Sequence, residues 1–319
     1  MFESSFLTKP LVFHKTNPFL MPSYFSQKFS FFVRNGGYAS AMTRALFAFT
    51  RRYLGVELNP LLRKRIAVSS KISRHFHGVI QKGVFHGVKL PSSFFRRSWT
   101  NGTIVLGQYE RPVAAVLHLL SSEGFTGLID IGAANGYYVV ASLQVGLFKN
   151  AIAFESSASY RKSMVDWLRA CSLDSQVCIR GSATKDELVN LSQQDLSLYV
   201  LLIDIDGGEF SLLDENVFAS YSDNAFIVEL HDWLFADSDE KRANLVNSSS
   251  NTHVPFILRG DSMDLGGVKL PPLSDIELFM ASADGRPFIG EWLILLPIGP
   301  RFSGLRDSLS RIACDMPPF

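Results

Sequence analysis

The feature that most constrains this chain is a regular alternation of short apolar runs with helix-compatible stretches, from about residue 127 almost to the end. The runs have the length and the β-branched character of buried strands. Such alternation predicts a parallel sheet with helices on both faces, because each parallel strand needs a crossover connection. The predicted strands are 127–131, 150–154, 176–180, 198–204, 224–230, 252–258 and 291–297, and the predicted helices between them are 136–146, 157–171, 185–192, 209–216, 239–246 and 274–282.

The stretch from Gly127 to Val140, GLIDIGAANGYYVV, predicts a ligand-holding loop after the first of these strands. The apolar run stops at Gly132, and small residues up to Gly136 allow the backbone to approach a ligand closely. The dinucleotide fingerprint requires glycine at its first, third and sixth positions. Ala134 and Tyr137 occupy the third and sixth positions here, which disfavours a nicotinamide or flavin cofactor.

The second apolar run, residues 151–154, ends on a carboxylate, Glu155. At the end of the second strand of a doubly wound sheet, a carboxylate is placed to accept both ribose hydroxyls of an adenosine ligand. The loop before it reads Asp-x-Gly-x-x-x-Gly and begins at Asp130. Together these features suit S-adenosylmethionine.

Four motifs, DIGAANGYY, AFESS, LLIDIDGGEFSLL and IVELHDW, follow one another over roughly Gln108 to Pro297. In this order they resemble the class I S-adenosylmethionine-dependent methyltransferases, and specifically the FkbM-like group. Ser156, Asp206 and Gly208 replace the proline, glutamate and alanine typical of that group. The resemblance implies a Rossmann-like sheet in the order 3-2-1-4-5-7-6 with an antiparallel seventh strand. It also implies methyl transfer to a hydroxyl of a sugar or small metabolite.

Candidate cofactor residues lie at strand ends, because ligands of open α/β sheets bind beyond the carboxyl ends of the strands. Asp130 is expected to organise the glycine loop and face the methionine ammonium, and Glu155 to bind the ribose. Ser182 with Ala183 is expected along the adenine edge. The alternatives are strand-end capping for the carboxylates and an ordinary loop position for the serine. The residues predicted to bind the cofactor are Asp130, Gly132, Ala133, Asn135, Gly136, Glu155, Ser156, Ser182, Ala183 and Asp204.

The residue predicted to activate a hydroxyl acceptor is His231, at the end of the fifth strand. A hydroxyl is a poor nucleophile until it loses its proton, and an imidazole suits the task of general base. Asp206 and Glu209 are expected to orient this histidine or to bind substrate. One alternative is a structural histidine bonded to nearby backbone. Another is magnesium held by Asp204, Asp206 and Asp232, but this is not favoured and no metal ligand is assigned.

The first part of the chain differs in charge from the rest. Residues 1–125 contain 17 Lys+Arg and four Asp+Glu, whereas the remainder contains 14 and 26, so charges of +13 and −12 nearly cancel. This split predicts either halves that neutralise each other by packing or an external anionic partner, such as a membrane surface. The predicted organisation is a basic, Phe-rich arm with an amphipathic helix (1–75), a strand-containing lead-in that includes TIVLG (76–107), a methyltransferase domain (108–298) and a tail that is a short helix at most (299–319).

Several other classes of protein are disfavoured. Cys171, Cys178 and Cys314 are too few and too unpatterned for a disulfide framework or a zinc site. No run reaches the ~18 apolar residues of a membrane-spanning helix, and the start lacks a signal-peptide pattern. A cytoplasmic protein is therefore expected, with peripheral docking at a membrane as an alternative, and no nucleic-acid partner. The competing function is a non-catalytic binding module that keeps the cofactor fold and docks on a membrane or a glycan-assembly complex.

Overall fold

A computed structural model describes residues 59–95, 100–260, 264–282 and 290–314, with a few helical residues between 33 and 47. Most of the basic N-terminal arm, including much of its expected amphipathic helix, lies outside the described residues. Its predicted role therefore stays a prediction. Within the described part, no helix is long and apolar enough to cross a membrane.

The core of the molecule is one seven-stranded sheet in the order β3-β2-β1-β4-β5-β7-β6. The first five strands of this order pair in parallel, whereas β7 runs antiparallel to both β5 and β6. The predicted Rossmann-like fold is confirmed, including the antiparallel seventh strand. The strands are β1 (Gly127–Ile131), β2 (Asn150–Phe154), β3 (Val177–Arg180), β4 (Tyr199–Ile203), β5 (Ala225–Glu229), β6 (His253–Arg259) and β7 (Glu291–Pro297).

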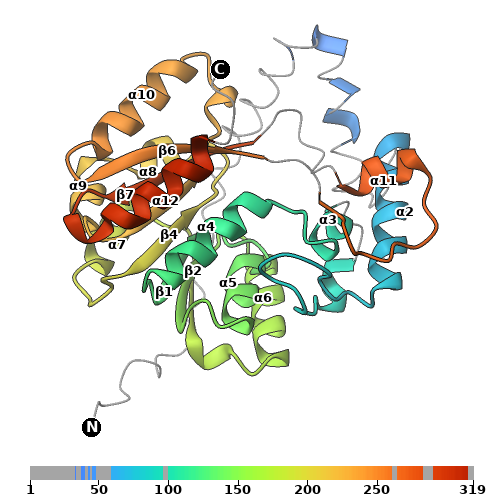
Figure 1. Cartoon of the computed structure of the whole chain (residues 1–319). Helices are drawn as coiled ribbons and strands as arrows, with labels where there is room; N and C mark the ends of the chain where they lie inside the picture. Colours follow the sequence, from blue (N-terminus) through green and yellow to red (C-terminus); the bar gives the residue numbers. More distant parts are fainter. Residues whose placement is uncertain are drawn as a thin grey trace.

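Helices cover both faces of the sheet (Figure 1). Successive strand residues point to opposite faces. In β1, Leu128 therefore joins the apolar core under α4, α5, α6 and α12, while Ile129 and Ile131 join the core under α7, α9 and α10. The helices are α2 (Pro60–His75), α3 (Asn101–Val105), α4 (Arg111–Ser122), α5 (Tyr137–Gln144), α6 (Ala158–Ala170), α7 (Lys185–Leu191), α8 (Glu209–Leu212), α9 (Glu215–Ser220), α10 (Ser238–Ser249), α11 (Asp275–Ser282) and α12 (Ser303–Cys314), with 3-10 turns η3 (Ser92–Phe95), η4 (Asp174–Gln176), η5 (Asp232–Leu234) and η6 (Pro300–Phe302).

The single helix predicted at 209–216 is instead two short helices, α8 and α9. The break lies at Asp214, whose backbone is extended, with φ −144° and ψ 179°. Its side chain accepts a hydrogen bond from the Val217 amide at 3.1 Å and pairs with Lys185 at 2.6 Å. Asp214 therefore acts as an N-cap, a role that aspartate favours over a helix interior.

The β-type run expected in TIVLG was a wrong prediction, because its first three residues belong to the buried helix α3 and Leu106 caps that helix. Its amide at Gly102 donates to Ser69 Oγ on α2 at 2.7 Å. A Cβ atom at Gly102 would lie 3.1 Å from the Ser69 Cα, so the two helices pack closely at this point. Packing against α2 thus overrides the β propensity of the run. In the rest of the lead-in, the described pairing is an isolated bridge between Val79 and Lys89.

The C-terminal tail is also more ordered than predicted. It contains the 12-residue helix α12, which buries Leu305 and Leu309 against the sheet together with Phe302 from η6. Arg306 fixes the turn before the helix, since its guanidinium donates to the carbonyls of Pro297 and Gly299 at 2.5 and 3.0 Å. These apolar residues recur every three or four positions, which is the period of an amphipathic helix.

Basic residues before position 125 contact the acidic part of the chain. Asp264 pairs with Lys82 at 2.6 Å and with Arg111 at 3.6 Å. Its backbone amide and carbonyl also bond the side-chain amide of Gln108 at 2.9 and 2.8 Å. For these residues the charge split is neutralised by packing inside the molecule.

Candidate active site

The glycine loop after β1 lies directly against the end of β4. Gly132 has a φ of +96°, and a Cβ atom there would lie 1.8 Å from the carbonyl oxygen of Asp204. Gly136 has a φ of +87°, and a Cβ atom there would lie 2.5 Å from a side-chain atom of Met164. Glycine is the residue that fits both the left-handed backbone and these close approaches. The loop residue Asn135 between them is half-buried.

Glu155, directly after β2, ties its own loop to the glycine loop. Its Oε2 accepts from the Ala134 amide at 2.9 Å, and its Oε1 accepts from the Ser157 amide at 2.5 Å. Arg161 from α6 holds the same turn, since its guanidinium donates to the carbonyls of Glu155 and Ser156 at 2.6 and 2.8 Å. The Ser156 hydroxyl also lies 3.4 Å from Oε1, whereas Oε2 has a second lone pair and keeps acceptor capacity for a ligand hydroxyl.

Three buried carboxylates gather around the glycine loop: Asp130, Glu155 and Glu110. Burial raises the pKa of Asp130 well above its ordinary value, and the charges of Asp204, Glu155 and Glu110 raise it further. Glu110 precedes α4 with a φ of +43° and accepts a hydrogen bond from the Tyr138 hydroxyl. Glu110 is a residue of this group that the four motifs did not predict. It ends the segment GQYE (107–110), which lies upstream of the four motifs.

His231, two residues after β5, is held by the fully buried carboxylate of Glu209. One oxygen of Glu209 accepts from the backbone amide of His231 at 2.9 Å and lies 3.3 Å from its Nδ1. The other oxygen accepts from the Gly207 amide at 2.9 Å. Because a carboxylate only accepts, the Nδ1 that faces it carries the proton, and Nε2 presents its lone pair on the opposite side of the ring. Glu209 therefore fixes both the tautomer and the orientation of His231.

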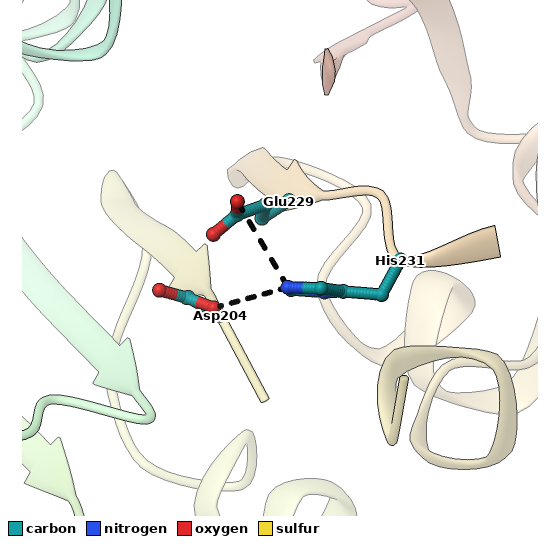
Figure 2. A group of neighbouring side chains, drawn as sticks. All are labelled: Asp204, Glu229 and His231. Atoms are coloured by element: carbon teal, nitrogen blue, oxygen red, sulfur yellow. Dashed lines mark ion pairs between the residues drawn. The ribbon is translucent and has the colours of Figure 1, made fainter. Parts of the chain in front are cut away.

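The Nε2 atom of His231 faces three carboxylates. Oxygens of Asp204, Asp206 and Glu229 lie 3.8, 3.9 and 3.9 Å from it. Figure 2 shows the side chains of Asp204, Glu229 and His231 directed toward one another from the ends of β4 and β5. Burial alone would lower the pKa of His231, but the hydrogen bond and charge of Glu209, with Asp204 and Asp206, raise it above its ordinary value.

The structure thus brings His231, Glu209, Asp204 and Asp206 together, and it adds Glu229, which the sequence analysis had left inside an apolar strand. The spacing in ELH could have identified Glu229, because residues two apart in an extended segment, here Glu229 and His231, point to the same face. Asp206 has a φ of +54°, which directs the chain into the turn before Glu209.

Other predicted residues lie apart from this group. Asp232 accepts from Arg242 Nε at 2.9 Å, and Arg242 also bonds Glu291 at the start of β7 at 2.5 Å. Asp232 therefore belongs to an ion-pair network that fastens η5 to α10 and β7. After β3, Ser182 is exposed, while Ala183 packs against the core under α7.

Solved structures that resemble the chain include two methyltransferases and a synthase. An O-methyltransferase from Bacillus cereus in complex with SAH has 11% identity and a TM-score of 0.38, over 79% of this chain and 97% of that chain. Precorrin-6y C5,15-methyltransferase from Geobacter metallireducens has 14% identity and a TM-score of 0.40, over 58% and 86%. Spermidine synthase from Thermotoga maritima has 15% identity and a TM-score of 0.40, over 61% and 60%. These likenesses concern the fold, and the activities are those of the neighbours.

No protein-family model matches the chain, and neither does any curated protein. The resemblance to the FkbM-like group therefore stays a prediction that rests on the four motifs.

Proposed function

We propose that this protein is an S-adenosylmethionine-dependent methyltransferase that acts on a hydroxyl of a sugar or small metabolite. The observation that carries the proposal is the contact between Gly132 and the backbone of Asp204. It sets the cofactor loop beside the group that contains His231. Donor and acceptor sites on adjacent strand ends are what methyl transfer needs, since the reaction consists mainly of aligning two reactants and excluding water.

The cofactor side of this proposal rests on the loop after β1 and on Glu155. Gly132 and Gly136 let the loop pack closely against Asp204 and Met164 with a left-handed backbone. Glu155 is buried at the position where a carboxylate binds ribose hydroxyls. A ligand with a positive sulfonium and ammonium would stabilise the charged forms of the Asp130 and Glu110 carboxylates. The predicted contacts of Ser182 and Ala183 with the adenine belong to the same proposal.

The acceptor side favours oxygen over nitrogen. A neutral amine needs little more than alignment, whereas a hydroxyl needs help to lose its proton. Here the buried His231 is oriented by the buried carboxylate of Glu209. Its Nε2 faces further carboxylates at the carboxyl ends of the strands. Hydroxyl activation is therefore assigned to His231.

Calorimetry of the full chain with S-adenosylhomocysteine tests the cofactor assignment. We expect binding at micromolar strength. A folded protein that gives no binding heat would overturn the assignment. Incubation with labelled S-adenosylmethionine and an extract of small metabolites then tests the activity. A non-catalytic binding module would bind the cofactor product but label no species.

A further inference from the structure

We propose that Asp204, Glu229 and His231 form a binding site for one divalent cation, called the cation site below. One ligand atom from each residue lies within 4.8 Å of the other two. Ligand atoms around a small divalent cation, each about 2.0–2.2 Å from it, are about 3–4 Å apart. The separations of 3.8 and 3.9 Å from His231 Nε2 to the carboxylates are wider than hydrogen bonds and fall in this range.

The second shell of the cation site is already in place. Metal-bound histidines donate their other ring nitrogen to a carboxylate or carbonyl, which fixes the ring and makes the ligand nitrogen more basic. Glu209 provides this contact at 3.3 Å from Nδ1, and its own oxygens are held by two backbone amides. The contact with Glu209 does not involve Asp204 or Glu229, and it directs Nε2 toward them.

The chemistry of the three ligands selects the kind of ion. Two carboxylates and one imidazole suit Mn²⁺ and related first-row ions, and oxygen ligands also suit Mg²⁺. Glu229 and His231 are nearly buried, with 5% and 7% of their side chains exposed, whereas Asp204 is 39% exposed. The cation site therefore opens on the side of Asp204, where water or a substrate oxygen can complete the coordination. Asp206 lies on this open side, with 57% of its side chain exposed.

The position of the cation site gives it a role that rests on the proposed function. It adjoins the glycine loop through the contact of Gly132 with Asp204. An acceptor hydroxyl bound to the cation becomes more acidic and loses its proton to water on the open side of the site. The resulting oxygen attacks the methyl carbon of S-adenosylmethionine as the carbon–sulfur bond breaks. The bond's electron pair leaves with the sulfur, which becomes the neutral thioether of S-adenosylhomocysteine. In this arrangement His231 activates the hydroxyl through the cation that it binds.

Titration of the metal-free full chain with Mn²⁺ alone tests the cation site. Electron paramagnetic resonance measures free Mn²⁺, so it reports binding without cofactor, acceptor or turnover. We expect one Mn²⁺ per chain. Asp204→Asn, Glu229→Gln and His231→Gln should each weaken binding at least about 10-fold, because each removes one ligand. Asp237→Asn is the matched control, since this acidic residue pairs with Lys241 on the exposed surface and should leave binding unchanged.

The outcomes separate this proposal from the proposed function. Absence of Mn²⁺ binding at millimolar concentration, or binding that the three variants leave unchanged, would overturn the cation site. Methyl transfer that persists in excess chelator would overturn its catalytic role, while the methyltransferase assignment would stand. Glu229→Gln changes a buried group and therefore carries the larger risk of misfolding. The Asp204 side chain is partly exposed, so Asp204→Asn tests the cation site with less risk to the fold. A circular dichroism spectrum confirms that each variant is folded.

Discussion

Two buried histidines lie at opposite edges of the same sheet, and their surroundings differ completely. His231 follows β5 and lies where the carboxyl ends of the parallel strands meet, which we call the carboxyl edge. His253 begins β6, which runs in the same direction as β5, so it lies at the opposite, amino edge. They are 6% and 1% exposed, so burial does not distinguish them. The ring nitrogens of His253 contact neutral groups, the Asn224 carbonyl at 2.9 Å and the Thr252 hydroxyl at 2.7 Å.

The pKa values of the two histidines move in opposite directions. Burial lowers the pKa of His253, and its hydrogen bonds do not offset that effect. The pKa of His231 is raised despite burial, because Glu209, Asp204 and Asp206 surround it. Neutral hydrogen-bond partners for the ring nitrogens of a buried histidine stabilise a fold. Several carboxylates packed around a buried histidine destabilise the fold unless a cation binds between them. This contrast supports the proposal that the functional site lies at the carboxyl edge.

The largest expected effect comes from removing His231, the histidine proposed to activate the hydroxyl. His231→Ala should lower turnover by about 10²–10⁴-fold and leave cofactor affinity nearly unchanged, because hydroxyl activation matters only on the way to the transition state. Steady-state kinetics and calorimetry measure the two quantities. His253→Gln is the matched control and should retain turnover per folded molecule. Equal losses of turnover in both variants would break the comparison between the two edges.

Glu209→Ala should reduce the free energy of unfolding by roughly 2–4 kcal/mol, because the backbone amides of His231 and Gly207 and one ring nitrogen lose their acceptor. Urea unfolding measures this loss. Glu209→Gln should recover part of it, since one acceptor oxygen remains while the other position becomes a donor facing the Gly207 amide. The exposed Glu215→Ala is the control, with an expected change within about 0.5 kcal/mol. A fully stable Glu209→Ala protein would contradict the assigned contacts.

Glu155→Ala should weaken cofactor binding by about 1–3 kcal/mol, or roughly 5- to 150-fold, through loss of charge-assisted hydrogen bonds to the ribose. This result would sharpen the comparison by separating cofactor binding from hydroxyl activation at the same edge. Calorimetry with S-adenosylhomocysteine measures the affinity. Asp166→Ala, a change on the exposed face of α6, should leave it unchanged. Parental affinity in Glu155→Ala would limit this residue to a structural contact.

Sequence patterns located the carboxyl edge well, because each buried strand is a short apolar run that stops at a polar or glycine residue. The boundaries of β1, β2 and β7 were predicted to the residue. Side chains that depend on packing were harder to predict. Local propensity made TIVLG a strand, although its contacts with α2 make it a helix. Glu229 was missed because it lies within the apolar run of β5.

The partners of each histidine could not be predicted from sequence, because they come from distant segments. His231 contacts Glu209, which lies 22 positions earlier, and His253 contacts Asn224, which lies 29 positions earlier. Both histidines adjoin strand ends, so the pattern alone does not tell the one proposed to be functional from the other. The charges of their neighbours in space make that distinction.

The smallest expected effect is a pH dependence of stability caused by His253. Its pKa is lower in the folded protein than the value of about 6.5 in the unfolded chain, so the unfolded chain binds the proton more readily. The stabilising contribution is present above about pH 6.5. It is lost as the pH falls below that value, until the folded protein also takes up the proton.

His253→Gln should therefore flatten the rise in unfolding free energy between pH 5 and about 7, because glutamine does not titrate and its amide still donates to the Asn224 carbonyl. Urea unfolding of parent and variant at several pH values measures the difference in slope. His86→Gln, which changes an exposed histidine, is the control. Parallel slopes for the parent and His253→Gln would show that His253 titrates alike in both states, and the contrast with His231 would then have to rest on contacts alone.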